Sequence, residues 1–273
     1  MPEPLMSVVL ATFNAGKTLQ RCLDSFRAQD YPAKELILKD GGSSDNTLDI
    51  IRSNKDTLTY WESAPDGGIY NAWNKALPHV KGEWVYFIGA DDYFLTPGVL
   101  SSAATLLRSA FPAYRVAYGR VDVVNAEGRV FMTAGDPWDR MKFLQFSSIP
   151  HQGVFQHKSL FAEYGLFDET FRITGDHEFL LRELKDKNAV FFPSLKVAVM
   201  SYGGVSSSPA NSIRALQEIY RARRKHKAGG FPKLLYLAFF RAYVWKLIAC
   251  VFGRAIADKA ANIYRKAVGR AVI

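Results

Sequence analysis

Short apolar runs alternate with segments of helical period over the first 110 residues. Four runs have the length and the β-branched or aromatic content of buried strands, namely residues 7–13 (SVVLATF), 35–39 (ELILK), 57–62 and 83–90 (EWVYFIGA). Helical segments lie between them, and in the first one Leu19, Leu23 and Phe26 share one face. This alternation predicts an α/β domain with a mostly parallel central sheet that helices flank on both faces.

The alternation fades after residue 110. Beyond that point we expect a hairpin, two helices and one or two strands, at residues 115–134, 158–165, 176–187 and 189–202 in turn. The stretch 201–209 is rich in Ser and Gly and predicts a loop. From residue 210 onward the pattern is helical, with breaks at 229–232 and at Gly253.

Each of the four predicted strands is followed by a loop rich in polar residues and glycine. The loops are Thr12-Phe13-Asn14, Asp40-Gly41-Gly42, Asp66-Gly67-Gly68 and Gly89-Ala90-Asp91-Asp92. Parallel strands end at the same edge of a sheet, and ligands of open α/β sheets bind beyond that edge. We therefore expect these loops to meet at one binding site.

The pair Asp91-Asp92 directly follows a very apolar strand. Carboxylates in that place are costly unless they are exposed, paired or bound to a metal. Mg²⁺ or Mn²⁺ takes few protein carboxylates and fills its shell with phosphate oxygens and water, which suits one or two aspartates at a strand end. The alternative is an N-cap for a helix that Pro97 would open. Because Asp40 and Asp66 end neighbouring strands, we favour the ligand site.

Asp40 closes its strand in front of two glycines, which would let a ligand approach the backbone closely. Its carboxylate is a suitable acceptor for the N–H of a uracil ring. The alternative is an aspartate that only hydrogen-bonds the backbone of its own turn.

Polar residues of the second half suggest acceptor chemistry. Asp176 opens a helical segment, where it is either a general base for an acceptor hydroxyl or a simple N-cap. Glu178 lies two positions later, so on a helix it points roughly the other way. His151 and Gln152 follow a proline, and His151 suits either an acceptor contact or a structural role.

Several classes of site are not indicated. Residues 15–18 (AGKT) end like a P-loop, but Ala11 stands where that motif needs glycine, and no dinucleotide-binding fingerprint follows a strand. No set of residues has zinc spacing or the order of a hydrolase triad. Cys22 and Cys250 are far apart within apolar patterns, which favours buried thiols in a reducing compartment. The first residues lack the features of a signal peptide, so we expect a cytoplasmic protein.

Charge is unevenly distributed. Residues 210–273 hold 14 Lys and Arg against 2 Asp and Glu, whereas residues 1–209 have a net charge of −3 and the whole chain +9. Such a tail suits an anionic membrane surface or a nucleic acid, or is a solvated charged face. The tail also contains a membrane-like segment, so we expect a membrane partner and no nucleic acid.

That segment, residues 231–252, is apolar over 22 positions, about enough to span a bilayer. Lys233, Arg241 and Lys246 interrupt it, and central charges are expensive in a membrane. We therefore expect an amphipathic helix lying in the membrane interface, with a helix packed on the main domain as the alternative.

Together these motifs make the chain resemble the inverting family-two glycosyltransferases of GT-A fold, especially bacterial enzymes of exopolysaccharide and O-antigen assembly. The resemblance covers about residues 5–200. It rests on SVVLATFN (7–14), LKDGGSSDNT (38–47), SAPDGGIYNAWNK (63–75), GEWVYFIGADD (82–92), PHQ (150–152), and the segment from Phe167-Asp168 to GDHEFL (175–180).

The resemblance implies roles for individual residues. Asp91 would hold the metal, and Asp176 would be the general base. The donor nucleotide and sugar would be bound by Thr12, Asn14, Asp40, Asp66, Lys75 and Asp92. His151, Gln152 and Glu178 would lie on the acceptor side. Three residues depart from the family pattern. Gly89 replaces the first acid of the D-x-D motif, Asn71 replaces the usual aspartate after Gly-Ile-Tyr, and Gly41 replaces a frequent aspartate.

The implied organisation is a catalytic domain over residues 1–208, with a nucleotide-sugar half at 1–110 and an acceptor half at 111–208, followed by a basic amphipathic helical tail at 209–273. The implied activity moves a sugar from a nucleotide-diphosphate sugar, a UDP-sugar first of all, to a saccharide or a polyprenyl-linked saccharide, with Mn²⁺ or Mg²⁺ as cofactor. The protein would lie on the inner face of the cell membrane. The alternatives are a sugar-nucleotide nucleotidyltransferase and a non-catalytic scaffold of polysaccharide assembly.

Overall fold

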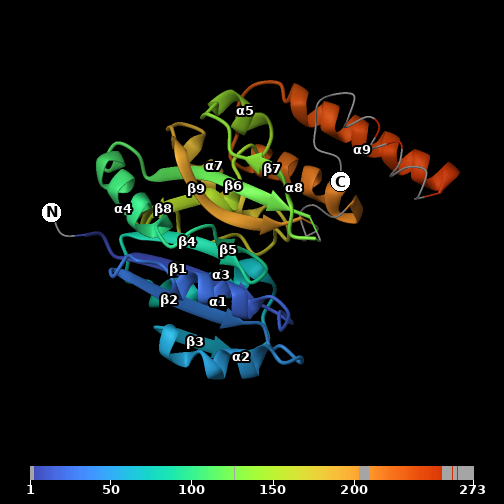
Figure 1. Ribbon diagram of the computed structural model, residues 1–273. Coiled ribbons are helices and arrows are strands. Elements are labelled where there is room, and N and C mark those ends of the chain that lie inside the picture. The colour runs from blue at the N-terminus through green and yellow to red at the C-terminus, as the bar shows by residue number, and fades with distance from the viewer. Residues whose placement is uncertain (1–2, 126, 203–208, 254–259, 261–262, 264–273) are drawn as a thin grey trace.

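The computed structural model describes residues 3–125, 127–202, 209–253, 260 and 263, and the fold is that of an α/β protein (Figure 1). In its first half, strands and helices alternate in the predicted way: β1 (Met6–Thr12), α1 (Leu19–Arg27), β2 (Lys34–Asp40), α2 (Thr47–Ser53), the 3-10 turn η1 (Lys55–Thr57), β3 (Tyr60–Ser63), α3 (Ile69–Ala76), η2 (Leu77–His79) and β4 (Trp84–Gly89). The strands β3, β2, β1 and β4 are adjacent in that order and parallel, so their carboxyl ends share one edge.

The second half extends the same sheet with mixed strand directions. Its elements are β5 (Tyr93–Phe94), α4 (Val99–Ala110), β6 (Val116–Val124), β7 (Val130–Ala134), α5 (Arg140–Gln145), η3 (His151–Gly153), β8 (Val154–His157), α6 (Ser159–Tyr164), α7 (Gly175–Leu184) and β9 (Val190–Ser201). The sheet order continues from β4 through β8, β6 and β9 to β5, and β7 pairs with β6. The predicted hairpin at 115–134 is confirmed as β6 and β7.

One central strand is absent from the expectations. The four-residue strand β8 pairs antiparallel with both β4 and β6, and it thereby joins the two halves of the sheet. A run this short carries too little periodicity to be recognised without its partners.

Two apolar layers cover the sheet, because successive strand residues point to opposite faces. Val8 and Leu10 of β1 pack in the layer that contains residues of α1 and α4, whereas Val9 packs in the layer that contains residues of α3 and α7. The sheet is therefore buried on both faces, which explains the nearly continuous apolar runs of its strands.

The C-terminal helices are α8 (Pro209–Lys225) and α9 (Lys233–Phe252). Leu216 and Ile219 of α8 form a small apolar cluster with Leu235 of α9, and the rest of α9 projects away from the sheet (Figure 1). The loop expected at 201–209 falls largely on residues 203–208, outside the described residues.

The expected amphipathic pattern of the tail is wrong for α9. Its inner side packs apolar residues such as Leu235 and Phe239 on α8 and α5, yet its outer side is apolar too, with Leu237, Phe240 and Leu247 more than 60% exposed. The apolar residues of this segment surround the helix axis rather than forming one stripe, which is the pattern of a helix covered by other apolar material.

Candidate active site

The turn that follows β2 is organised by Asp40. The residue is 1% exposed. Its Oδ2 accepts hydrogen bonds from the backbone N–H of Gly42 (3.1 Å), the N–H of Ser43 (2.9 Å) and the hydroxyl of Ser63 (2.6 Å). These contacts are those of a carboxylate that orders its own turn. Only Oδ1, which the Ser43 hydroxyl also reaches, retains acceptor capacity for a nucleotide base, so the base contact of Asp40 stays a prediction.

The loop after β1 lies against this turn. The Gly41 N–H donates to the carbonyl of Thr12 (2.9 Å), and Asn14 Oδ1 accepts from the Ser44 N–H (2.9 Å). The side chain of Asn14 thus links the loops that follow β1 and β2. The hydroxyl of Thr12 is buried and has no hydrogen-bond partner within the described residues. Because an unsatisfied buried hydroxyl costs free energy, Thr12 is well suited to pair with a ligand.

The loop after β3 completes this cluster. A Cβ added to Gly41 would lie 2.9 Å from Asp66 Oδ2, so the aspartate occupies the space of a side chain at position 41. Asp66 Oδ1 accepts from the Gly68 N–H (2.8 Å), and the exposed Lys75 donates to the carbonyl of Pro65 (3.3 Å). The loops of β1, β2 and β3 therefore meet at one place beside the sheet edge. The absence of a side chain at 41 is what lets Asp66 approach.

The acidic pair after β4 folds back over Gly89. A Cβ added to Gly89 would lie 2.9 Å from both Asp91 Oδ1 and Asp92 Oδ2. The carboxylates thus fill the space that an acidic side chain at 89 would need, which gives the missing first acid of the D-x-D pattern a steric reason. The turn is closed by the Asp92 N–H on the Gly89 carbonyl (3.1 Å), and Arg21 binds the Asp91 carbonyl (2.9 Å).

The environment of Asp92 opposes its negative charge. Burial and the neighbouring Asp91 carboxylate raise the pKa of Asp92 to about 7, although the Ser201 N–H (3.2 Å) and the Gln152 side chain both donate to it. Two like charges so close favour a proton or a cation between them. The pair therefore fits Mg²⁺ or Mn²⁺, which prefer carboxylate oxygens and usually take only one or two from the protein. In the described residues, no cluster of three or more His, Cys, Asp or Glu side chains is placed to hold a metal.

Residues of the short helix η3 interact electrostatically with both Asp92 and Asp176. Gln152 reaches Asp92, and the preceding His151 lies close enough to Asp176 for that carboxylate to oppose the burial that lowers the pKa of His151. Asp176 is half-buried in the first turn of α7, and its Oδ1 accepts from the Tyr70 hydroxyl (3.2 Å). Burial and Asp176 together raise the pKa of Tyr70, so this hydroxyl stays protonated and donates. The Tyr70 hydrogen bond thus connects Asp176 with α3, which directly follows the loop of Asp66.

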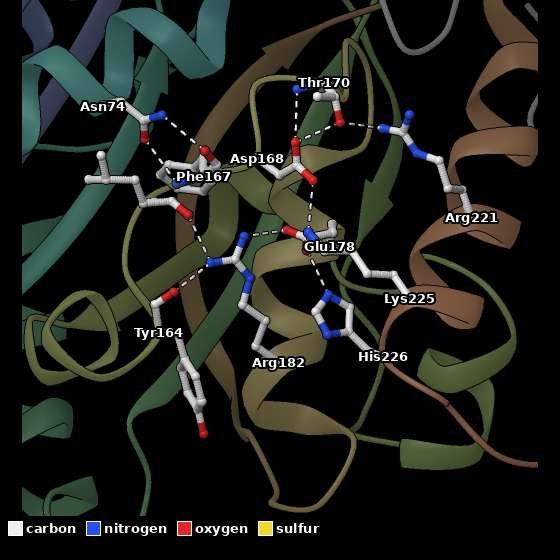
Figure 2. A network of polar contacts seen from close by, with 11 residues as sticks. Asn74, Tyr164, Phe167, Asp168, Thr170, Glu178, Arg182, Arg221, Lys225 and His226 are labelled. Carbon is white, nitrogen blue, oxygen red and sulfur yellow. Dashed lines mark hydrogen bonds and ion pairs between the residues drawn. The ribbon is translucent and has the colours of Figure 1, made fainter.

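Glu178 does not belong to this group. Figure 2 shows it at the centre of a network between α7 and α8, where it pairs with Arg182 (2.6 Å), Lys225 (2.7 Å) and His226 (2.6 Å). Glu178 is fully buried. Burial alone would raise its pKa, but the hydrogen bonds from these side chains outweigh burial and hold the pKa at about 2. The expected acceptor-side role of Glu178 is therefore replaced by a structural one.

Comparison with known proteins decides the family. Residues 7–162 match the model of the glycosyl transferase family 2. The chain belongs to this family. An uncharacterised glycosyltransferase of Mycobacterium tuberculosis is 35% identical over 181 residues, which is 66% of this chain and 68% of the relative.

Two solved structures share the fold of this family 2 glycosyltransferase. TarS of S. aureus (residues 1–349), in complex with UDP-GlcNAc, has a TM-score of 0.63 at 18% identity, over 86% of this chain and 70% of TarS. The mannosyltransferase PcManGT of Pyrobaculum calidifontis, in complex with GDP-Man and Mn²⁺, has a TM-score of 0.63 at 21% identity, over 98% of this chain and 80% of PcManGT. The predicted fold class and the predicted transferase class are confirmed.

Four residues around the site of this glycosyltransferase were not singled out from the sequence. Tyr70 contacts Asp176, and Ser201 holds both acidic residues, with its N–H on Asp92 and its hydroxyl on the Asp91 carbonyl (3.0 Å). Arg21 binds that same carbonyl, and Arg172 donates to the Gly67 carbonyl. Tyr70 was visible within the family motif, but the other three contacts join segments that only folding brings together.

Proposed function

We propose that this family 2 glycosyltransferase transfers a sugar from a nucleoside-diphosphate sugar to a hydroxyl group of a saccharide or lipid-linked saccharide, with inversion at the anomeric carbon. The observation that carries the proposal is the hydrogen bond from the Tyr70 hydroxyl to Asp176 (3.2 Å), because Tyr70 lies in the first turn of α3, directly after the loop of Asp66. One helix thus ties a donor-side loop to a carboxylate suited to act as a base. The nucleotide would lie over the loops that hold Thr12, Asn14, Asp40 and Asp66, with Lys75 near its phosphates or ribose.

The chemical step needs one proton acceptor. Asp176 takes the proton of the acceptor hydroxyl, the hydroxyl oxygen bonds to the anomeric carbon, and the bond from that carbon to the diphosphate oxygen breaks. The proton stays on Asp176 and the nucleoside diphosphate leaves with the electron pair. Tyr70 orients the Asp176 carboxylate through its hydroxyl. His151 is neutral at pH 7 because burial lowers its pKa, so it can accept or donate a hydrogen bond to the acceptor without adding charge.

Asp91, together with Asp92, would hold Mn²⁺ or Mg²⁺. When bound, such an ion offsets the negative charge that develops on the leaving diphosphate. Asp92 is the more buried of the two and is oriented by Ser201 and Gln152. We accordingly expect Asp92 to lie beside the donor sugar and Asp91 to be the main metal ligand.

A screen of nucleotide sugars tests the proposed donor class. We expect released nucleoside diphosphate with a UDP-sugar or, as the second choice, a GDP-sugar, with a rate that rises on adding Mn²⁺. The Asp91→Ala variant should lose most of this metal stimulation, because it removes a charged ligand. Release of pyrophosphate from a nucleoside triphosphate and a sugar phosphate would instead identify a nucleotidyltransferase. A protein that binds nucleotide sugar without releasing any product, over the whole panel, would be a scaffold.

We also propose that α9 contacts a membrane and that the protein is peripheral on the cytoplasmic face. Three observations support this. The helix has 20 residues and is long and apolar enough to cross a membrane, and its outer apolar side chains are exposed. Residues 210–273 carry a net charge of +12, which complements anionic lipid. Lys233, Arg241 and Lys246 favour an interfacial position over full insertion.

Vesicle sedimentation tests the membrane proposal. The double variant F240E/L247E places charges on the outer side of α9, where the native side chains are 69% and 64% exposed. We expect it to bind vesicles containing phosphatidylglycerol at least tenfold more weakly than the native chain, since each charge would enter an apolar environment. The control V130E/L166E changes two apolar residues that are each 54% exposed elsewhere, and it should bind like the native chain. Equal binding of all three proteins would contradict the proposal.

A further inference from the structure

The carboxylate of Glu218 in α8 accepts hydrogen bonds from the backbone just before α7. Its Oε1 accepts from the N–H of Arg172 (3.0 Å), and its Oε2 accepts from the N–H groups of Ile173 (2.9 Å) and Thr174 (3.0 Å). Glu218 is only 7% exposed, although Arg214 approaches the carboxylate from the solvent side (3.4 Å). Hydrogen bonds to an ionised acceptor are stronger than neutral ones, so three of them hold this backbone firmly.

Residues 172–174, which donate these hydrogen bonds, directly precede the first turn of α7 and the proposed base Asp176. Thr174 is the N-cap of α7 but makes no side-chain capping bond, and Asp176 follows two residues later. The carboxylate of Glu218 fixes the chain immediately ahead of the helix, where the local sequence provides no fixation of its own. Any shift of residues 172–174 would move the first turn of α7 and the Asp176 carboxylate with it.

Other contacts hold the same segment from the opposite side. The guanidinium of Arg172 donates to the Gly67 carbonyl in the donor-side loop. A Cβ added to Gly175 would lie 2.8 Å from the ring of Tyr70, which also donates to Asp176. The segment 172–176 is therefore fixed between α8 and the donor half. The hydrogen bonds to Glu218 limit how far it can move away from that half.

We infer that Glu218 is a positioning residue for the transfer reaction, which keeps Asp176 at the correct distance from the sugar bound in the donor half. The inference rests on the proposed function, because it assumes that Asp176 is the base. The helix α8 lies in the tail expected from residue 209 onward, but its Glu218 carboxylate supports the site. The catalytic unit therefore extends through α8, and a chain ending at residue 208 should lose transfer.

The test is the variant Glu218→Gln in the full chain. The glutamine amide has one acceptor oxygen, and its NH₂ group faces the backbone N–H groups as a second donor. Hydrogen bonds to residues 172–174 should therefore be lost without a change in side-chain volume. We expect kcat for sugar transfer to fall on the order of 10- to 100-fold, as for misplacement of a catalytic group by about 1 Å. The KM for the nucleotide sugar should change less than about twofold.

Glu35→Gln is the matched control. Glu35 is 5% exposed and accepts from the backbone N–H groups of Lys81 (2.7 Å) and Gly82 (3.2 Å), near the amino ends of the strands. It has the same chemistry as Glu218 but lies away from the site, so its loss should lower Tm and leave kcat unchanged. If Glu218→Gln lowers Tm by as much as Glu35→Gln does and leaves kcat unchanged, Glu218 is merely structural and the inference is overturned.

Two further variants separate the possible failures. Glu218→Asp keeps the charge on a shorter side chain, and a fall in kcat with a native Tm supports positioning even where the glutamine variant does not fold; a native kcat overturns it. In the double variant D176N/E218Q, the second substitution should add no further loss to the residual rate, because Glu218 acts through Asp176. Full additivity would overturn the inference. Native transfer by D176N alone would overturn the proposed function instead.

Discussion

Asp176→Asn should lower the rate of sugar transfer about 100- to 10,000-fold, which is the usual contribution of a positioned acid or base. The amide keeps the size of the carboxylate and can still accept the hydrogen bond from Tyr70. It cannot take the proton of the acceptor hydroxyl. Binding of the nucleoside diphosphate, measured by calorimetry, should be unchanged, since the proposed nucleotide and metal contacts do not include Asp176.

Asp186→Asn serves as the control for this prediction. Asp186 lies just beyond the end of α7, and its side chain is 76% exposed. It should transfer sugar at the native rate. Native transfer by the Asp176 variant would exclude this residue as the base, and loss of nucleotide binding in that variant would assign Asp176 to the donor side.

Glu178→Ala should destabilise the protein by about 3–5 kcal/mol, the typical result of removing one partner from a buried ion pair. The substitution leaves Arg182 and Lys225 without their shared carboxylate between α7 and α8. Chemical denaturation at pH 7 measures the change. Asp49→Ala is a suitable control, because its ion pair with Arg52 is exposed and such pairs contribute little.

The same residue predicts how stability depends on pH. The pKa of Glu178 is about 2 in the folded protein, below its ordinary value of 4.5. A carboxylate with a lowered pKa stabilises the fold above its unfolded pKa and loses that contribution as the pH falls toward the folded one. The native protein should therefore lose stability between about pH 5 and pH 2 more steeply than the Glu178→Gln variant. Equal slopes for the two proteins would contradict the ion-pair network as the cause.

Local patterns were enough for the nucleotide half of the fold. The four parallel strands and the loops that follow them were all predicted, because a buried strand and its turn are specified by adjacent residues. Strand β8 was missed, since its four residues become a strand only by pairing with β4 and β6. We expected one apolar stripe on α9, but its apolar residues surround the axis, and which of them face outward depends on what the rest of the chain covers.

Sequence motifs indicated the family, which the family model confirms, and local patterns predicted the α/β sheet and the acidic pair at the end of β4. The resemblance predicts Asp176 as the base, and the helical period already turns Glu178 away from it. What the packing of α8 adds is the surroundings of each: Lys225 and His226 enclose Glu178, whereas Asp176 stays half-buried beside Tyr70. The hydrogen bonds between Glu218 and residues 172–174 could not be predicted from the sequence either, since they join positions more than forty residues apart. Such contacts have no local signature, so only the tertiary structure could place them.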